Sequence, residues 1–277
     1  MNYIQRAKKF RTKKRLGQNF LIDESILDSI VDYANININD TVIEIGPGIG
    51  FLTEKLVKEA GNVIAIELDQ DAIHHLDKIN ANNLKIVHND ILKTDISSLS
   101  KGKVKVVANI PYYITSPILV HLLGEIDDLN NKNRNSIDSI ILMVQLEVAY
   151  RMIANEKSAS KQYGLLSVLS QFYCDVELLK VVKSRSFYPA PKVDSALVKL
   201  KVRPEPSLEL TDYKFFKKIL KALFATRRKN IRNCLIQAGL NPSDVDFTLN
   251  FCNLDKNLRA ENLSLSSIAK ISETLIS

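Results

Sequence analysis

Cysteine is scarce in this chain, and the cysteines that it has are scattered. Only three occur among the 277 residues, at Cys174, Cys234 and Cys252. An odd number of distant cysteines argues against a disulfide framework, and their spacing is not that of a metal site. We therefore expect reduced and mostly buried thiols.

Long apolar runs are also missing. No stretch approaches the roughly 20 apolar residues that a membrane-spanning helix needs, and the first residues lack the apolar core of a secretion signal. The four histidines form no ligand cluster, and none is paired with a nucleophile. With 45% hydrophobic and 25% charged residues, the composition is globular. We expect a cytoplasmic protein without membrane contact or bound metal.

Positive charge is in excess and is concentrated in two segments. The formal net charge is +7. Residues 6–15 hold seven Lys and Arg side chains and no acidic one, and a second basic excess spans residues 201–232. Two such segments around a nearly neutral middle indicate a polyanionic partner. Each run alone is equally typical of a solvated surface, and the first also resembles a transit peptide, although no serine precedes Ser25.

Strand and helix patterns alternate over the first two thirds of the chain. The apolar strands that we expect span residues 41–45, 63–66, 85–88, 103–108, 139–144, 176–182 and 193–202. Helical patterns lie between them, including one after Asp23 and one that Ser116-Pro117 is expected to open, and residues 130–136 are expected to form a polar loop. This alternation indicates an α/β fold with a parallel, Rossmann-like sheet covered on both faces.

The pattern changes after Pro204-Glu205-Pro206. From Thr211 onward the apolar spacing is helical, and no strand-like segment follows. We therefore predict two domains, residues 1–203 with a basic N-terminal arm and residues 204–277 as a small all-helical domain.

A glycine-rich turn follows the first expected strand. Gly46, Gly48 and Gly50 lie between this strand and a helix, and Glu67 ends the next strand 21 residues beyond Gly46. This arrangement is typical of a nucleoside site in which the acidic residue binds ribose hydroxyls. It fits NAD or S-adenosylmethionine. Glu44 favours S-adenosylmethionine, because a carboxylate near a diphosphate is unfavourable.

Two polar strand ends complete the expected site. Asp90 follows the third strand and is placed either to accept a hydrogen bond from an adenine amino group or to cap the next helix. Asn109-Ile110-Pro111-Tyr112 follows the fourth strand, which neighbours the first in a doubly wound sheet. The Asn109 carbonyl can accept N–H bonds from an adenine amine, which draws its lone pair out of the ring. Tyr112 and Phe187 could stack on the base, although isolated aromatic residues are more often core residues.

Several motifs together resemble the ribosomal RNA adenine dimethyltransferase family over nearly the whole chain. They are Gln18-Asn19-Phe20-Leu21, Glu44 to Gly50, Asn109 to Tyr112, Phe187 to Ser195 and Arg227-Arg228-Lys229. The segment Arg259 to Ser264 is similar to the bacterial small-subunit branch more than to the erythromycin-resistance methylases. One departure is Leu146, where relatives commonly have lysine that could contact RNA.

The resemblance implies a class I methyltransferase sheet and dimethylation of two adjacent adenosines near the 3′ end of small-subunit rRNA during ribosome assembly. S-adenosylmethionine would be the methyl donor, the assembling small subunit the partner, and the protein a monomer. The implied cofactor residues are Gln18, Asn19, Leu21, Gly46, Gly48, Glu67, Leu68, Asp90, Ile91 and Asn109. The implied target residues are Asn109, Pro111, Tyr112 and Phe187, and the RNA-binding residues are Lys13, Lys14, Arg15, Arg227, Arg228 and Lys229.

Three other functions were considered, and two of them remain open. The chain could be a mainly non-catalytic binding factor of ribosome assembly, or a large-subunit rRNA methylase that confers macrolide resistance. A dehydrogenase would need a hydride-transfer site, which the Asn109 turn does not offer.

Overall fold

The computed structural model describes residues 2–159 and 162–276, which divide into two compact units. The larger unit comprises residues 2–124, 130–149 and 175–202, and the smaller one residues 125–129, 150–159, 162–174 and 203–276. Residues 150–159 and 162–174 thus group with the C-terminal helices, whereas a boundary after residue 203 assigns them to the domain of the sheet. A functional division between two domains stays a prediction.

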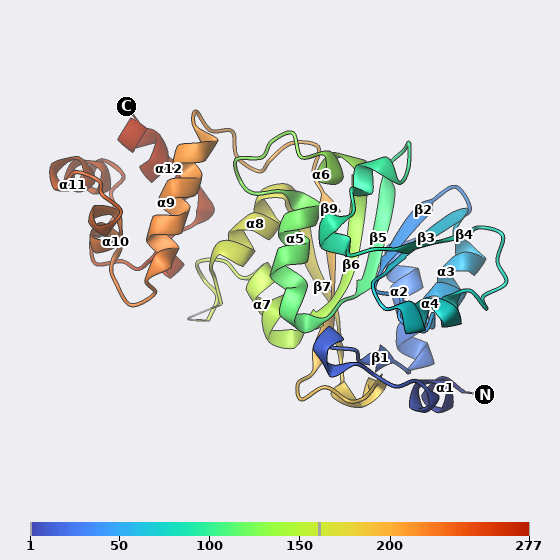
Figure 1. Ribbon diagram of the computed structural model, residues 1–277. Helices are drawn as coiled ribbons and strands as arrows, with labels where there is room; N and C mark the ends of the chain where they lie inside the picture. Colours follow the sequence, from blue (N-terminus) through green and yellow to red (C-terminus); the bar gives the residue numbers. More distant parts are fainter. Residues whose placement is uncertain (1, 160–161, 277) are drawn as a thin grey trace. The chain divides into compact units, whose positions relative to one another are not determined.

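A seven-stranded sheet forms the centre of the larger unit (Figure 1). The strands are β2 (Thr41–Ile45), β3 (Asn62–Glu67), β4 (Leu84–His88), β5 (Val104–Asn109), β6 (Ile137–Gln145), β7 (Cys174–Val182) and β9 (Ser195–Val202). Their order is β4-β3-β2-β5-β6-β9-β7. The first five are paired in parallel, as the alternating pattern predicts, whereas β9 runs antiparallel to β6.

Helices cover both faces of this sheet. Those of the larger unit are α1 (Tyr3–Lys9), α2 (Glu24–Ala34), α3 (Thr53–Glu59), α4 (Gln70–Leu76), α5 (Thr115–Leu123), α6 (Lys132–Ser136) and the first part of α7 (Leu146–Ile153). Val42, Val63 and Val107 pack with Leu27 of α2 and Leu56 of α3 in one core cluster. Their neighbours Ile43, Ile64 and Val106 are also buried and point to the opposite face, because side chains alternate along a strand. Figure 1 shows α5 on that side of the sheet.

Two local expectations are wrong. Helix α5 begins at Thr115, one residue before the expected Ser116 cap, and the Thr115 side chain donates to Tyr112 O (3.2 Å). Residues 132–136 form the short helix α6 instead of a polar loop. The Asn131 side chain accepts from Arg134 N (2.9 Å) and so caps this helix. A polar composition thus conceals a capped helical turn.

The N-terminal basic segment is partly folded onto the larger unit. In α1, Tyr3 packs against Phe51 with ring centroids 4.8 Å apart, and Arg6 forms a bidentate ion pair with Glu54. Immediately after α1, Phe10 meets Phe20 edge to face. The predicted arm therefore begins as a packed helix, which its charge pattern alone does not indicate.

The smaller unit is helical, as the apolar spacing predicts. Its helices include α8 (Leu165–Tyr173), α9 (Tyr213–Ala225), α10 (Ile231–Gln237), α11 (Pro242–Phe251) and α12 (Leu265–Ile276). Phe172 and Phe216 pack together in its core. All three cysteines of the chain are buried thiols outside any disulfide, which confirms the expectation. In the described part of the chain no helix has the length and apolarity to cross a membrane.

Gly61, in the turn between α3 and β3, has no room for a side chain. A Cβ atom there would lie 2.1 Å from Ile38 O. We predict that Gly61→Ala lowers the free energy of unfolding by roughly 2–3 kcal/mol, because a backbone segment must move. Urea denaturation of both variants would measure this, with Gly102→Ala as the control, since a Cβ at Gly102 meets nothing within 4 Å. Equal stability of the two variants would contradict the clash.

Candidate active site

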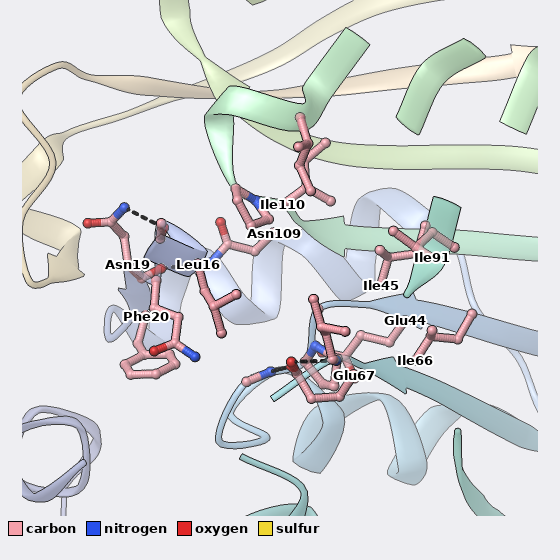
Figure 2. A pocket seen from close by; sticks show the side chains of 18 of the residues that line it. Leu16, Asn19, Phe20, Glu44, Ile45, Ile66, Glu67, Ile91, Asn109 and Ile110 are labelled. Atoms are coloured by element: carbon pink, nitrogen blue, oxygen red, sulfur yellow. Dashed lines mark hydrogen bonds between the residues drawn. The ribbon is translucent and has the colours of Figure 1, made fainter. Parts of the chain in front are cut away.

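The order of the strands brings the carboxyl ends of three neighbouring strands to one edge of the sheet. Strand β2 lies between β3 and β5 and is parallel to both, so the chain connections diverge on its two sides. In open α/β sheets ligands bind at the carboxyl ends of strands at such a switch point. Here the ends of β2, β3 and β5 carry Gly46, Glu67 and Asn109, and a cavity lies against them (Figure 2).

The glycine turn after β2 has a backbone that other residues rarely adopt. The φ angles of Gly46, Gly48 and Gly50 are 66°, 58° and 86°. At Gly48 a Cβ atom would also lie 2.7 Å from Cε1 of Phe20. The turn therefore presents backbone to the cavity, as the glycine spacing predicts.

Glu67 is buried at the end of β3 and is surrounded by backbone donors. Its Oε2 accepts from Gly48 N (2.9 Å), and its Oε1 accepts from Leu68 N and Asp69 N (2.8 and 2.7 Å). Burial raises the pKa of Glu67 although these three amides act in the opposite direction. A carboxylate offers about four acceptor positions. Oε2 therefore retains capacity for one further donor, such as a ribose hydroxyl.

Glu44 lies deeper and is almost completely enclosed. Thr53 Oγ1 donates to Glu44 Oε2 (2.6 Å), and Glu44 is 2% exposed. Burial raises the pKa of Glu44 to about 8, with a smaller contribution from the charge of Glu67. The side chain is thus neutral at pH 7. The expectation that a Glu44 charge discriminates against a diphosphate is therefore not supported.

The Asn109 turn is fixed by its neighbours on both sides. Asn109 Nδ2 donates to Asn19 O (3.1 Å), which leaves its Oδ1 as the acceptor on the other side of the amide. Figure 2 shows Asn19 and Asn109 next to each other. Pro111 precedes a 3-10 turn, and the Tyr112 hydroxyl lies 2.5 Å from Ser195 Oγ. Burial raises the pKa of Tyr112, against the opposing effect of the Ser195 bond.

A hydrogen-bonded ring joins the N-terminal segment to α4. Lys13 N donates to Gln18 Oε1 (2.8 Å), Gln18 Nε2 donates to Asp69 Oδ2 (2.7 Å), and Lys13 Nζ pairs with Asp69 Oδ1 (2.5 Å). Burial alone would raise the pKa of Asp69, but the bonds from Lys13 and Gln18 hold it below its usual value. Sequence analysis missed Asp69, because its partners lie more than 50 residues away.

The structure gathers nearly all of the expected site residues. The cavity is lined by Gln18, Asn19, Leu21, Gly46, Gly48, Glu67, Leu68, Asp90, Ile91, Asn109, Pro111 and Tyr112. For Asp90 the structure shows the cap, since its Oδ1 accepts from Leu92 N (3.0 Å), and the residue also lines the cavity, where its bond to an adenine amino group stays a prediction. The roles of these residues stay predictions.

Phe187 is placed differently from the expectation. It is 2% exposed, pairs with Leu21 in a two-stranded ribbon of β1 (Phe20–Leu21) and β8 (Phe187–Tyr188), and belongs to the core cluster. It is not among the residues that line the cavity. In this arrangement Phe187 supports the N-terminal segment, and its stacking on a base stays a prediction. Tyr113, which sequence analysis did not select, lines the cavity mouth with 62% of its surface exposed.

The basic residues that were expected to bind RNA fall into different environments. Lys13 is engaged with Asp69 and Asp71, whereas Lys14 and Arg15 are exposed. Arg227, Arg228 and Lys229 lie between α9 and α10 in the smaller unit, where Lys229 Nζ donates to Gln237 Oε1 (2.6 Å). Their contacts with RNA stay predictions.

The raised pKa of Glu44 generates a prediction about stability and pH. The folded protein holds a proton on Glu44 up to about pH 8, while the unfolded chain releases it near pH 4.5. The contribution of Glu44 to the free energy of unfolding is therefore fully present below pH 4.5. This contribution falls as pH rises to about 8, by at most about 1.4 kcal/mol per pH unit. Gln at this position stays neutral, so we expect the melting temperature of Glu44→Gln to exceed that of the parent increasingly as pH rises.

Thermal unfolding of both proteins between pH 5 and about pH 9 would measure this difference. Other titrating groups affect both proteins alike and cancel in the comparison. A difference in melting temperature that does not change with pH would show that Glu44 is ionised in the folded state.

Comparison with known proteins points to one group. A family model described as ribosomal RNA adenine dimethylase matches residues 9–277. Ribosomal RNA small subunit methyltransferase A of Clostridium botulinum (strain Kyoto / Type A2) is 40% identical over 96% of this chain and 94% of its own length. The protein of the same description from Shouchella clausii is 41% identical over 100% of this chain and 94% of its own.

Two solved structures share the architecture. The crystal structure of a dimethyladenosine transferase from Plasmodium falciparum aligns with a TM-score of 0.73 and 29% identity, over 90% of this chain and 94% of that one. The 23S rRNA methyltransferase ErmE aligns with a TM-score of 0.68 and 25% identity, over 94% of this chain and 100% of that one. The expected α/β methyltransferase sheet is thus confirmed at the level of fold.

Proposed function

This chain belongs to the ribosomal RNA adenine dimethylase family, and we propose that it dimethylates two adjacent adenosines near the 3′ end of small-subunit rRNA. The observation that carries this proposal is the position of the Asn109 amide. It opens onto the same cavity as the glycine turn and Glu67, so a nucleoside cofactor and an adenine amine can meet there. We place the reaction in ribosome assembly in the cytoplasm, with the protein acting as a monomer and without a metal.

The cavity residues fit S-adenosylmethionine as the methyl donor. Glu67 Oε2 has one acceptor position left for a ribose hydroxyl, and Asp90 carries a second oxygen that can accept from the adenine amino group. Leu68 and Ile91 supply apolar surface next to them. When bound, the cofactor supplies an electrophilic methyl group. The neutral Glu44 is compatible with this ligand but does not select it.

The target amine needs orientation more than acid–base chemistry. Asn109 Nδ2 is held by Asn19 O, so Oδ1 can accept an N–H of the adenine amine and turn its nitrogen lone pair toward the methyl donor. Tyr112, whose hydroxyl is tied to Ser195, can offer its ring to the base. Alignment of this kind supplies roughly 7–11 kcal/mol of the barrier reduction. The base must be unstacked to reach the cavity, and must do so again after the first methyl transfer.

The small-subunit substrate is favoured over the large-subunit one. The relatives named small subunit methyltransferase A are 40–41% identical over nearly the whole chain, whereas the 23S rRNA methyltransferase ErmE is 25% identical. The exposed Lys14 and Arg15 near the cavity and the basic Arg227-Arg228-Lys229 segment supply positive charge for an RNA backbone. A purely structural assembly factor would not need Glu67, Asp90 and Asn109 on one cavity.

The test of this function is methyl incorporation from labelled S-adenosylmethionine. Unmethylated small subunits, large subunits and naked rRNA would be compared in parallel. We expect label on two adjacent adenosines of the small subunit. Label in the large subunit would place the chain with the resistance methylases, and particle binding without label would indicate an assembly factor.

The role of Asn109 gives a sharper prediction. Replacing it by alanine removes the acceptor for the target amine and the donor to Asn19 O, so we expect Asn109→Ala to lose at least about 99% of methyl transfer. Cofactor affinity should change far less, because Glu67 and the glycine turn are intact. Single-turnover methylation and calorimetric cofactor binding would measure the two effects. Parent-like activity would remove Asn109 from the mechanism.

A further inference from the structure

We propose that Asp69 is a positioning residue that holds the segment 13–19 closed over the cavity and so slows the release of the cofactor. The proposal rests on the proposed function, because it assumes that the cofactor is S-adenosylmethionine. It assigns a role to Asp69, and it gives Lys13 a role in cofactor retention in place of the expected RNA contact.

Asp69, which follows β3, accepts the hydrogen bonds that attach this segment to the sheet. Its side chain has no exposed surface, and its two oxygens bind Lys13 Nζ and Gln18 Nε2 separately. Lys13 N in turn donates to Gln18 Oε1. Three residues therefore close a ring in which the two carboxylate oxygens of Asp69 accept from two donors of the segment, and Lys13 Nζ also pairs with Asp71.

The ring determines what the segment presents to the cavity. Oε1 and Nε2 of the Gln18 side chain both form hydrogen bonds within the ring, so the side-chain amide cannot rotate freely. One residue further on, the backbone oxygen of Asn19 accepts from Asn109 Nδ2. The ring thus acts through the backbone on the amide that is proposed to orient the target amine.

The same residue also contacts the cofactor side of the cavity. Asp69 N donates to Glu67 Oε1 (2.7 Å), and Glu67 is the proposed ribose acceptor. The side chain of Asp69 therefore holds the N-terminal segment while its backbone holds Glu67. A residue in this position couples closure of the segment to the geometry of the carboxylate.

The segment is the part of the lining that can open. Residues 16–19 lie at the end of a 3-10 turn and in the residues that follow it, outside the ladders of the seven-stranded sheet, as do several other loop residues of the lining. The cavity volume is about 120 Å³, below the roughly 300–1000 Å³ of typical ligand pockets. Breaking the ring would release the segment from Asp69 and widen the cavity at this side.

Two further contacts limit how far the segment moves. The Tyr113 hydroxyl donates to Arg15 O (3.2 Å), and a Cβ at Gly17 would lie 3.1 Å from Tyr113 Cε1. These contacts are at the exposed rim and involve no charge. The ion pair of Lys13 with Asp69 is the charged contact of the closed segment with α4, together with a second pair to Asp71 (2.6 Å).

The test measures release of S-adenosylhomocysteine from the full-length protein without RNA. Stopped-flow displacement would compare the parent with Lys13→Met, Asp69→Asn and Lys13→Arg. We expect the first two to release the probe about fivefold faster or more, and Lys13→Arg to retain slow release because its guanidinium can restore the pair. Lys8→Met is the control. Lys8 is an exposed lysine of α1, so this substitution removes the same charge outside the ring.

Salt provides the readout that a merely structural role would not change. Raising the ionic strength from about 0.05 to 0.5 M should speed release from the parent but have little effect in Lys13→Met, where the pair is already absent.

The outcomes separate the two proposals. Parent-like release rates in both Lys13→Met and Asp69→Asn would overturn the inference while leaving the proposed function intact. Failure of the parent to bind S-adenosylhomocysteine would instead contradict the proposed function. If Asp69→Asn is unstable, Lys13→Met still decides, because it leaves the buried carboxylate of α4 in place.

Discussion

The buried carboxylate of Glu67 and the three backbone amides that bind it organise the whole cavity. Burying a carboxylate is costly unless donors surround it, and here Gly48 N, Leu68 N and Asp69 N do so. The glycine turn after β2 can reach Glu67 only because Gly48 adopts a positive φ and lacks a Cβ that would clash with Phe20. The end of one strand therefore depends on the backbone of its neighbour.

Around this fixed carboxylate the site divides into a rigid part and a covering part. The strand ends are held by the ladders of a seven-stranded sheet, while the cover is a short segment between α1 and β1. Asn109 belongs to the rigid part but donates to the cover through Asn19 O. Under the two proposals, one backbone segment would therefore both orient the Asn109 amide and enclose the cofactor.

Sequence analysis predicted what depends on local pattern and failed where a distant partner decides. The five parallel strands were predictable from their apolar runs and turns, and the strand-order rule then placed Asn109 beside Gly46. The burial of Phe187 could not be predicted, because a two-residue strand shows no alternation that would reveal it. The raised pKa of Glu44 follows from its complete burial, and this burial could not be predicted from its position before a glycine turn. Asp69 was not selected from the sequence, because only the fold brings Lys13 and Gln18 to it.

The basic run at residues 6–15 shows why a count of charges does not define an interface. Arg6 and Lys13 are used within the protein, by Glu54 and by Asp69, whereas Lys14 and Arg15 point to solvent from the same segment that covers the cavity. Under the two proposals, RNA phosphates and the cofactor act on opposite sides of one backbone. Thermodynamic linkage then requires that any tightening of the cofactor by RNA be matched by an equal tightening of RNA by the cofactor. Such coupling would favour methyl transfer only when both substrates are in place.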